Sequence, residues 1–214
     1  MKRSGTSLPP VLYEDEAVIA FDKPTGMPVV APRPRGSQRG ATHLIGLVHD
    51  KLSPEYVNAH RLDRETSGVL LCAKTRDALR RLSELFDARG VEKRYLALVR
   101  GPVGADRGVV TSPLAPDPRR PGRMCVASDG KASQTAFEVI ERWQWGYVLL
   151  GVTPKTGRTH QIRVHLAQIG CAVVADALYG DGRGLYLSEI KKDYHGGGGK
   201  ERPILGRLAL HAES

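Results

Sequence analysis

The stretch HRLDRETSGVLLCAK, His60–Lys74, places Asp63 between two arginines, Arg61 and Arg64, directly before an apolar segment. The apolar run after Ser67 is short and dense, which predicts a buried strand. An aspartate between cations at the start of such a strand has two interpretations. It is either an ion-paired anchor for a loop or the reactive group of an enzyme.

The clearest helix in the sequence follows this strand. Thr75 is a suitable N-cap, and Gly90 is a suitable stop. Between them, apolar residues share one helical face: Ala78, Leu79, Leu82, Leu85 and Phe86. This spacing predicts an amphipathic helix.

The rest of the chain contains more strands than helices. ATHLIGLVHDKL predicts a short helix, and Thr159–Gln168 predicts another that stops at Gly170. Strands are predicted in the segments EKRYLALVRG, GVVTS, RMCVAS, TAFEVIERW, GYVLLGVTP, AVVAD and LALHA. Because strands and helices do not alternate regularly, the sequence predicts an α+β fold.

The composition is that of a globular, basic protein. The 214 residues are 41% hydrophobic and 26% charged, and 32 Lys and Arg against 23 Asp and Glu give a formal net charge of +9. Such an excess favours polyanionic partners, because each neutralised phosphate releases counterions. A solvated basic surface is the alternative.

The cysteines and the first residues indicate a cytoplasmic protein. Cys72, Cys125 and Cys171 are too far apart in the sequence for a metal knuckle or a redox pair, so we expect reduced thiols. The start MKRSGTSLPP has no apolar run. No segment approaches the roughly 20 apolar residues of a membrane span, so no membrane partner is expected.

Two familiar catalytic arrangements do not fit the segment TPKTGRTHQIRVHLAQIG. His160 and His165 are off the i, i+4 spacing of two metal ligands on one helical face, and the Glu of a zinc helix is missing. The sequence also contains no G-x-S-x-G elbow, the motif that carries the nucleophile in many Ser-His-Asp hydrolases. Taken singly, Asp63, Tyr95 and Arg163 each also have a purely structural interpretation.

Four motifs together make the chain resemble the RluA-type RNA pseudouridine synthases. They are HRLD-x-x-TSG before an apolar strand, Y-x-A-L-V-x-G in a strand, TGRTHQIRVHL-x-x-x-G, and D-x-x-YG at Asp176–Gly180. LYEDEAVIAFDKPTGMPV is similar to the family's N-terminal strand and Lys-Pro turn, so the resemblance runs from about Val11 to His211. It implies one catalytic domain with a mixed, mostly antiparallel central sheet, flanking helices and a central basic cleft.

The resemblance also implies roles for individual residues. Asp63 matches the catalytic aspartate, which acts either at the ribose C1′ or at the base. Tyr95 matches the pocket tyrosine that lies against the flipped-out base and handles a proton. Arg163 matches the arginine that pairs with the catalytic carboxylate and keeps it charged. RNA or substrate contacts are implied for the remaining motif residues: Arg61, Ile162, His160, Arg158 and Lys23.

The domain layout differs from that of many relatives. We expect residues 1–10 to form a flexible tail and residues 11–214 the catalytic domain, without a separate N-terminal RNA-binding module. RNA recognition then falls to basic loops of the catalytic domain, with Arg33, Arg35 and Arg39 as candidates. We expect the C-terminal end to be shorter than usual, because relatives continue with strands that close the sheet.

The expected partner is structured RNA, ribosomal, transfer or both, in which specific uridines are isomerised to pseudouridine. The reaction involves no redox change, so neither a cofactor nor a metal is expected. DNA is not an expected partner, and we expect a monomer. Two alternatives stay open: a catalytically inactive RNA-binding or assembly factor on the same fold, and an RNA hydrolase that uses His60 and Asp63.

Overall fold

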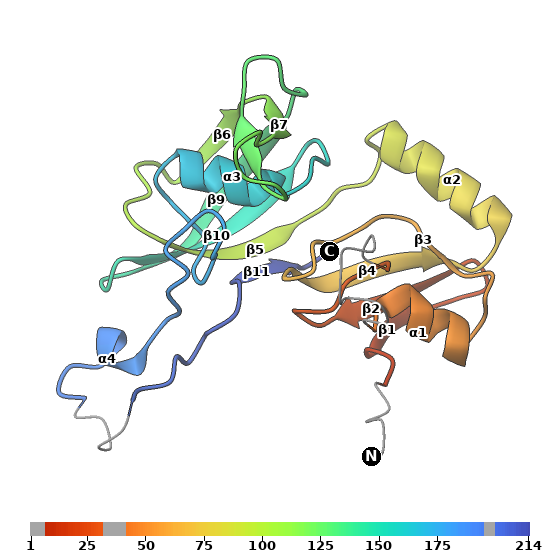
Figure 1. The fold of residues 1–214 in the computed structure, drawn as a ribbon, viewed down its shortest axis with the longest axis horizontal. Helices are drawn as coiled ribbons and strands as arrows, with labels where there is room; N and C mark the ends of the chain where they lie inside the picture. The colour runs from red at the N-terminus through yellow and green to blue at the C-terminus, as the bar shows by residue number, and fades with distance from the viewer. Residues whose placement is uncertain (1–6, 32–41, 195–199) are drawn as a thin grey trace. The chain divides into compact units, whose positions relative to one another are not determined.

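The computed structural model describes most of the chain, namely residues 7–31, 42–194 and 200–214. The candidate RNA contacts Arg33, Arg35 and Arg39 lie outside these residues. The chain forms two compact units, Met1–Glu92 with Ser214, and Lys93–Glu213 (Figure 1). Within the part of the chain that is described, no helix is long and apolar enough to cross a membrane.

The first unit contains antiparallel strands and two helices. β2 (Val18–Lys23) pairs with β1 (Val11–Glu14) and with β4 (Ser67–Ala73). The short β3 (Val57–Asn58) pairs with β4 as well. The helices of this unit are α1 (Leu44–Lys51) and α2 (Arg76–Asp87).

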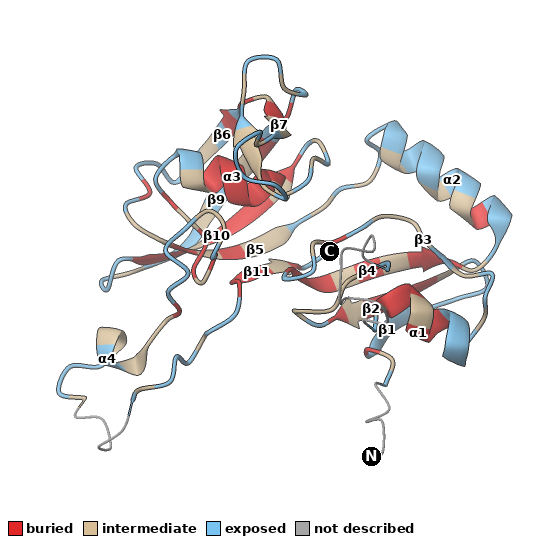
Figure 2. Ribbon diagram, in the orientation of Figure 1, coloured by how far each residue is buried: buried red, intermediate tan, exposed pale blue. Residues whose placement is uncertain are grey.

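The local sequence explains these elements. Phe21 and Leu70 are partners in the β2–β4 register, and both are fully buried, as the apolar runs of the two strands predict. The Thr75 side chain accepts a hydrogen bond from the Ala78 amide (3.1 Å) and so caps α2, as expected. Apart from Ala78, however, no residue of α2 is buried (Figure 2). The amphipathic pattern thus predicted the helix but not its burial.

The second unit is built on a larger antiparallel sheet. β5 (Tyr95–Arg100) pairs with β10 (Tyr147–Pro154), which pairs in turn with β9 (Gln134–Trp143). β11 (Leu210–Ala212) lies beside β5, and β6 (Arg107–Thr111) lies beside β9. All of these pairs are antiparallel, in agreement with the mostly antiparallel sheet that we expected.

Three further elements complete the second unit. They are the hairpin of β7 (Leu114–Pro116) and β8 (Met124–Val126), the helix α3 (Gln161–Gln168), and the short α4 (Leu187–Ile190). α3 contributes Ile162 and Leu166 to the core that includes the buried face of β5 and β10. In contrast to α2, α3 is buried along most of its length (Figure 2).

Two details differ from the sequence-based expectations. The segment AVVAD is not a strand: Val173 forms only an isolated bridge with Val99, because Ala175 adopts a left-handed conformation (φ 59°) that ends the extended backbone. α3 begins at Gln161 rather than Thr159, because His160 is also left-handed (φ 54°). The sequence also did not predict the short elements β1, β3, β7 and α4. The α+β class is confirmed.

Candidate active site

The loop that carries Asp63 lies between β3 and β4 in the first unit. Leu62 is buried, Asp63 is half-buried, and Arg61 is exposed. The His60 ring accepts a hydrogen bond at Nε2 from the Leu71 amide (3.1 Å) and lies against the Phe86 ring. His60 and Leu62 therefore anchor the loop in the unit.

Lys23, at the end of β2, supports the Asp63 loop from the interior of the first unit. Its side chain is fully buried, and its ammonium Nζ donates to the carbonyl oxygens of Pro24 (3.0 Å), Met27 (2.9 Å) and Arg64 (3.1 Å). An ammonium carries three donors, so all of them have partners within the protein. This geometry favours a supporting role for Lys23 over the direct RNA contact that we expected from the sequence.

Burial also changes the acidity of this lysine. Desolvation lowers the pKa of Lys23 to about 8, although the nearby carboxylates of Glu65 and Asp63 act in the opposite direction. The lysine thus brings a positive charge close to the Asp63 loop without exposing it to solvent.

The turn after Lys23 holds the same loop by two further hydrogen bonds. The Thr25 hydroxyl donates to the Glu65 carbonyl (2.7 Å), and Arg64 Nε donates to the Gly26 carbonyl (3.0 Å). Gly26 has φ +79°, which other residues adopt at a cost, so the K-P-T-G turn needs glycine there. The Lys-Pro turn and the HRLD loop, distant in sequence, therefore form one local structure.

Tyr95 belongs to the second unit, where it begins β5. It is half-buried, and it alternates along the strand with Leu96 so that it shares a face with the buried Ala97 and Val99. Tyr95 packs against the core of the second unit. The aromatic ring thus lies at the margin of the core face.

Arg163 on α3 forms a buried ion pair with Asp176. Its Nε and Nη2 each lie 2.7 Å from a carboxylate oxygen, and both side chains are almost inaccessible. Burial raises the pKa of Asp176, but the Arg163 guanidinium and the amides of Leu178 and Tyr179 outweigh it and lower that pKa below its ordinary value. Asp176 therefore fixes the orientation of the arginine that the sequence identified.

Polar side chains attach the other face of α3 to β9. Gln161 Nε2 donates to the Gln134 carbonyl (2.9 Å) and to the Thr135 hydroxyl (3.0 Å). His165, one turn later and completely buried, has Nδ1 2.8 Å from the same Thr135 hydroxyl and Nε2 3.0 Å from the Ser112 carbonyl. Since a carbonyl only accepts, Nε2 carries the proton. These bonds fix α3, and with it Arg163, on the sheet.

The remaining predicted residues lie around the start of α3. Ile162 is buried in the core of the second unit, and Arg158 Nε donates to the Ala132 carbonyl (3.3 Å). His160 is half-buried, with Nδ1 2.7 Å from the Tyr179 hydroxyl. The predicted residues are thus divided between the units: Lys23, Arg61 and Asp63 in the first, and Tyr95, Arg158, His160, Ile162 and Arg163 in the second.

Sequence reasoning assigned no role to four residues that organise this region. Asp176 and Tyr179 stand in the D-x-x-YG motif, which marked them without saying what they contact. Gln161 and His165 occupy i and i+4 positions of α3, and a buried polar pair at that spacing was the available signal. Among the described residues, no group of three or more His, Cys, Asp or Glu side chains is arranged to hold a metal ion.

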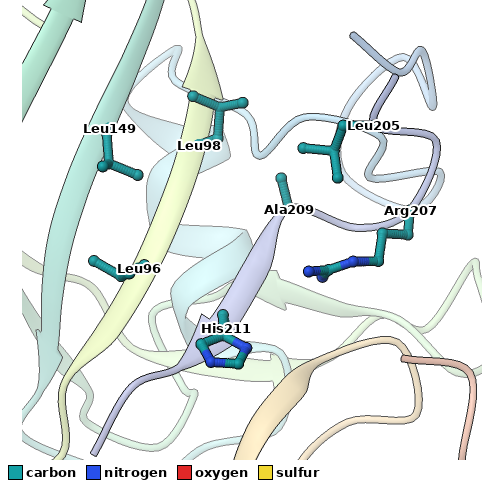
Figure 3. A pocket seen from close by; sticks show the side chains of 7 residues that line it. All are labelled: Leu96, Leu98, Leu149, Leu205, Arg207, Ala209 and His211. Atoms are coloured by element: carbon teal, nitrogen blue, oxygen red, sulfur yellow. The ribbon is translucent and has the colours of Figure 1, made fainter. Parts of the chain in front are cut away.

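The second unit also has a pocket on the opposite face of its sheet (Figure 3). Its volume is about 130 Å³, and its lining includes Leu96 and Leu98 of β5 and Leu149 of β10. These leucines alternate along their strands with buried core residues, so the pocket lies on the sheet face opposite to Ala97 and Val99. It contains none of the predicted site residues.

Sequence comparison now identifies the family. A sequence model of the RNA pseudouridylate synthase family matches residues 17–168, most of the chain, including Asp63, Tyr95 and Arg163. The chain belongs to this family, and its resemblance to the RluA type is confirmed.

Curated relatives are longer than this chain. The ribosomal large subunit pseudouridine synthase C of Escherichia coli (strain K12) is 40% identical over 174 residues, which cover 80% of this chain and 53% of that protein. An uncharacterized RNA pseudouridine synthase of Aquifex aeolicus is 41% identical over 179 residues, which cover 79% and 55%. The chain spans about half the length of the curated relatives that it matches.

Solved structures agree with this assignment. The human RNA pseudouridylate synthase domain containing 1 superposes with a TM-score of 0.73 at 28% identity, covering 99% of this chain and 79% of that one. The human domain containing 4 has a TM-score of 0.67 at 23% identity, which supports the fold alone.

Proposed function

We propose that this protein is an RNA pseudouridine synthase that isomerises specific uridines in structured RNA, with Asp63 as its catalytic carboxylate. Two findings support this proposal: the family match over residues 17–168 and the position of Asp63 on a firmly held loop. The Escherichia coli relative is a ribosomal large subunit pseudouridine synthase, so large-subunit rRNA is the first substrate to test. Transfer RNA, a cytoplasmic location and a monomeric state stay predictions.

The chemistry requires few groups from the protein. The N1–C1′ bond of uridine breaks, the uracil turns, and C5 bonds to C1′, while C5 loses a proton and N1 gains one. No electrons are gained or lost overall. Asp63 supplies a carboxylate at the nucleotide, either to C1′ or to the base, and Tyr95 stacks on the everted base and moves a proton. Eversion costs a few kcal/mol, so a replacement face for the base is needed.

The other site residues support these two. Asp176 holds the Arg163 guanidinium in a fixed orientation, and Ile162 provides an apolar wall for the base. Arg61 and Arg158 bind phosphates, as solvent-accessible guanidiniums do in RNA-binding proteins. Lys23 keeps the Asp63 loop in place.

Further phosphate contacts come from the tip of the β7–β8 hairpin. Arg119 and Arg120 are exposed there, and Arg123 is half-buried. Internal hydrogen bonds hold this tip: the Asp117 amide donates to the Arg123 carbonyl (2.9 Å), and the Arg119 amide donates to an Asp117 carboxylate oxygen (2.9 Å). A held loop loses little conformational entropy on binding, which favours its use as a contact to the RNA backbone.

The experiment is conversion of large-subunit rRNA transcripts labelled with tritium at uridine C5. Purified protein is expected to release tritium to water, because C5 exchanges its hydrogen for a carbon bond, and to leave pseudouridine at few positions. Binding of the RNA without tritium release would instead favour an inactive RNA-binding or assembly factor. Shortened RNA would favour a hydrolase, and either result overturns the proposal.

A further inference from the structure

Lys93 is a half-buried lysine that lies directly before β5, two residues from Tyr95. A methyl group at Gly157 would be 3.9 Å from the ammonium Nζ of Lys93, so this ammonium lies against the turn that leads to α3. Arg158, one of the phosphate contacts proposed above, follows Gly157 directly. The turn therefore carries one cation in its own sequence and has a second one against its backbone.

The strand register explains why Lys93 reaches this turn. Tyr95 lies opposite Val152 in the antiparallel pairing of β5 with β10. Two residues further, the same register brings Lys93 level with Pro154, the last residue of β10. Because side chains alternate along an extended chain, Lys93 is expected on the side of Tyr95, and Arg94 on the other side.

The two adjacent cations differ in their counter-ions. Arg94 has two carboxylates from its own unit: its Nη2 lies 3.2 Å from a Glu138 oxygen, and its Nε lies 3.1 Å from a Glu213 oxygen. For the Lys93 ammonium, neither an ion pair nor a hydrogen bond is present among the described residues. The protein thus neutralises the arginine but not the lysine beside it.

Partial burial makes the missing counter-ion of Lys93 costly. Desolvation lowers the pKa of Lys93 below its ordinary value, and within the described part of the chain no carboxylate opposes this shift. The buried Lys23, by comparison, donates to three backbone carbonyls and has two carboxylates near it. A half-buried lysine without such partners is a suitable binding position for an external anion. A bound phosphate would favour the charged form of its ammonium.

We propose that Lys93 is a substrate-binding residue whose ammonium donates to a phosphate oxygen of the RNA next to the everted uridine. The base meets Tyr95, two residues along the chain, so the phosphate belongs to the everted nucleotide or to its neighbour. Arg158 supplies a second cation from the adjoining turn. This inference rests on the proposed function, because it concerns the same substrate at the same site.

The salt dependence of RNA binding tests this contact directly. Lys93→Met removes the charge but keeps an unbranched side chain, so the dissociation constant for rRNA transcripts is expected to rise about five- to tenfold. Because one phosphate contact is lost, the slope of log Kd against log salt concentration is expected to decrease by about 0.7–0.9. Lys93→Arg keeps the charge and is expected to keep the slope. An unchanged slope in Lys93→Met overturns the proposal.

Arg94→Gln is the matched control, because it removes one positive charge from the very next residue. Glu138 and Glu213 already neutralise this arginine, so the variant is expected to bind RNA within about twofold of wild type and with the same salt slope. Equal losses of affinity in Lys93→Met and Arg94→Gln would assign the effect to net charge alone and contradict the proposal.

Stability in the absence of RNA separates a binding role from a structural one. Lys93→Met removes a half-buried charge that has no counter-ion, so its thermal unfolding temperature is expected to equal or exceed that of wild type. A lysine that holds the fold together would give the opposite result. A lower unfolding temperature combined with lost RNA affinity would assign Lys93 a structural role and overturn the proposal.

These measurements separate this inference from the proposed function. If wild type binds RNA but releases no tritium from uridine C5, the proposed activity fails, while the affinities and salt slopes of the variants still decide the role of Lys93. If wild type is active and Lys93→Met matches it in affinity and slope, the activity stands and the phosphate contact of Lys93 is excluded.

Discussion

The helices α2 and α3 differ in opposite ways from what their sequences suggest. α2 has a regular apolar stripe, yet only Ala78 is buried in it. α3 contains arginine, glutamine and histidine, yet its residues from Gln161 to Leu166 are all buried. The difference shows that periodicity predicts the existence of a helix, whereas burial of α3 depends on polar partners supplied by distant residues. Such buried polar groups are also where a functional site is expected.

The largest expected difference in stability between the helices concerns one Arg–Asp pair that involves each of them. Arg163→Met leaves Asp176 as a buried carboxylate without its counter-ion, which is expected to cost about 3–5 kcal/mol of unfolding free energy. Arg81→Met breaks an exposed pair with Asp77 on α2 and is expected to cost less than about 1 kcal/mol. Urea unfolding of both variants measures the two values, and equal losses would refute the distinction.

Substitutions of apolar residues compare the stability contributions of the two helices without a change in charge. Leu166→Ala on α3 removes a completely buried side chain and is expected to cost about 2–5 kcal/mol, because a cavity replaces it. Leu85→Ala on α2 removes a side chain that is 48% exposed, so about 0.5 kcal/mol is expected. Thermal unfolding of the pair provides the check. A large loss at Leu85 would mean that α2 contributes more to stability than its exposure indicates.

A pH dependence follows from the buried His165 of α3. Burial lowers its pKa below the ordinary value, although the Ser112 carbonyl opposes this. The unfolded chain therefore binds a proton at this residue before the folded one does, so stability is complete above about pH 6.5 and falls as the pH decreases below it. One proton limits the slope to about 1.4 kcal/mol per pH unit.

Urea unfolding between pH 7.5 and 5.5 measures this slope. His165→Gln removes the titrating ring while keeping a polar side chain, so its stability is expected to be lower but to change less over the same range. A slope for the variant as steep as that of wild type would assign the acid sensitivity to other groups.

The smallest expected effect concerns the cap of α2. Thr75→Ala removes the acceptor for the Ala78 amide and is expected to cost about 1 kcal/mol. Thr75→Ser keeps a hydroxyl and is expected to cost less. α3 has no side-chain cap at His160; at its start the Gln161 side chain accepts from the Arg158 amide instead (3.0 Å). If Thr75→Ala leaves the free energy of unfolding unchanged, the cap does not contribute to the stability of the first unit.

Much of this molecule was predictable from local sequence. The strands β4, β5, β9 and β10 and the start of α2 follow from apolar runs, alternation and a threonine cap. The left-handed His160 was not predictable, because the contacts that hold it come from a segment 19 residues away. Nor was the attachment of α3 to Thr135, because a hydrogen bond between distant residues has no periodic signature in the sequence.

The candidate site residues were likewise predictable only in part, because the sequence does not reveal their contacts with distant residues. The motifs made Asp63, Tyr95 and Arg163 candidates, because their residue types and spacing match the pattern of the family. They did not reveal that Asp176 binds Arg163 or that Lys23 is buried beneath the Asp63 loop. Those contacts connect segments far apart in the chain, and they form only when the chain folds.

The central claim is that the Asp63 carboxylate carries the reaction, and Asp63→Asn tests it most directly. The substitution preserves size and removes the charge, so tritium release from uridine C5 in rRNA is expected to fall at least about 100-fold. RNA affinity is expected to stay within about threefold of wild type. Asp87→Asn, at the exposed end of α2, serves as the matched control with unchanged activity. Release by Asp63→Asn within about tenfold of wild type would contradict the account.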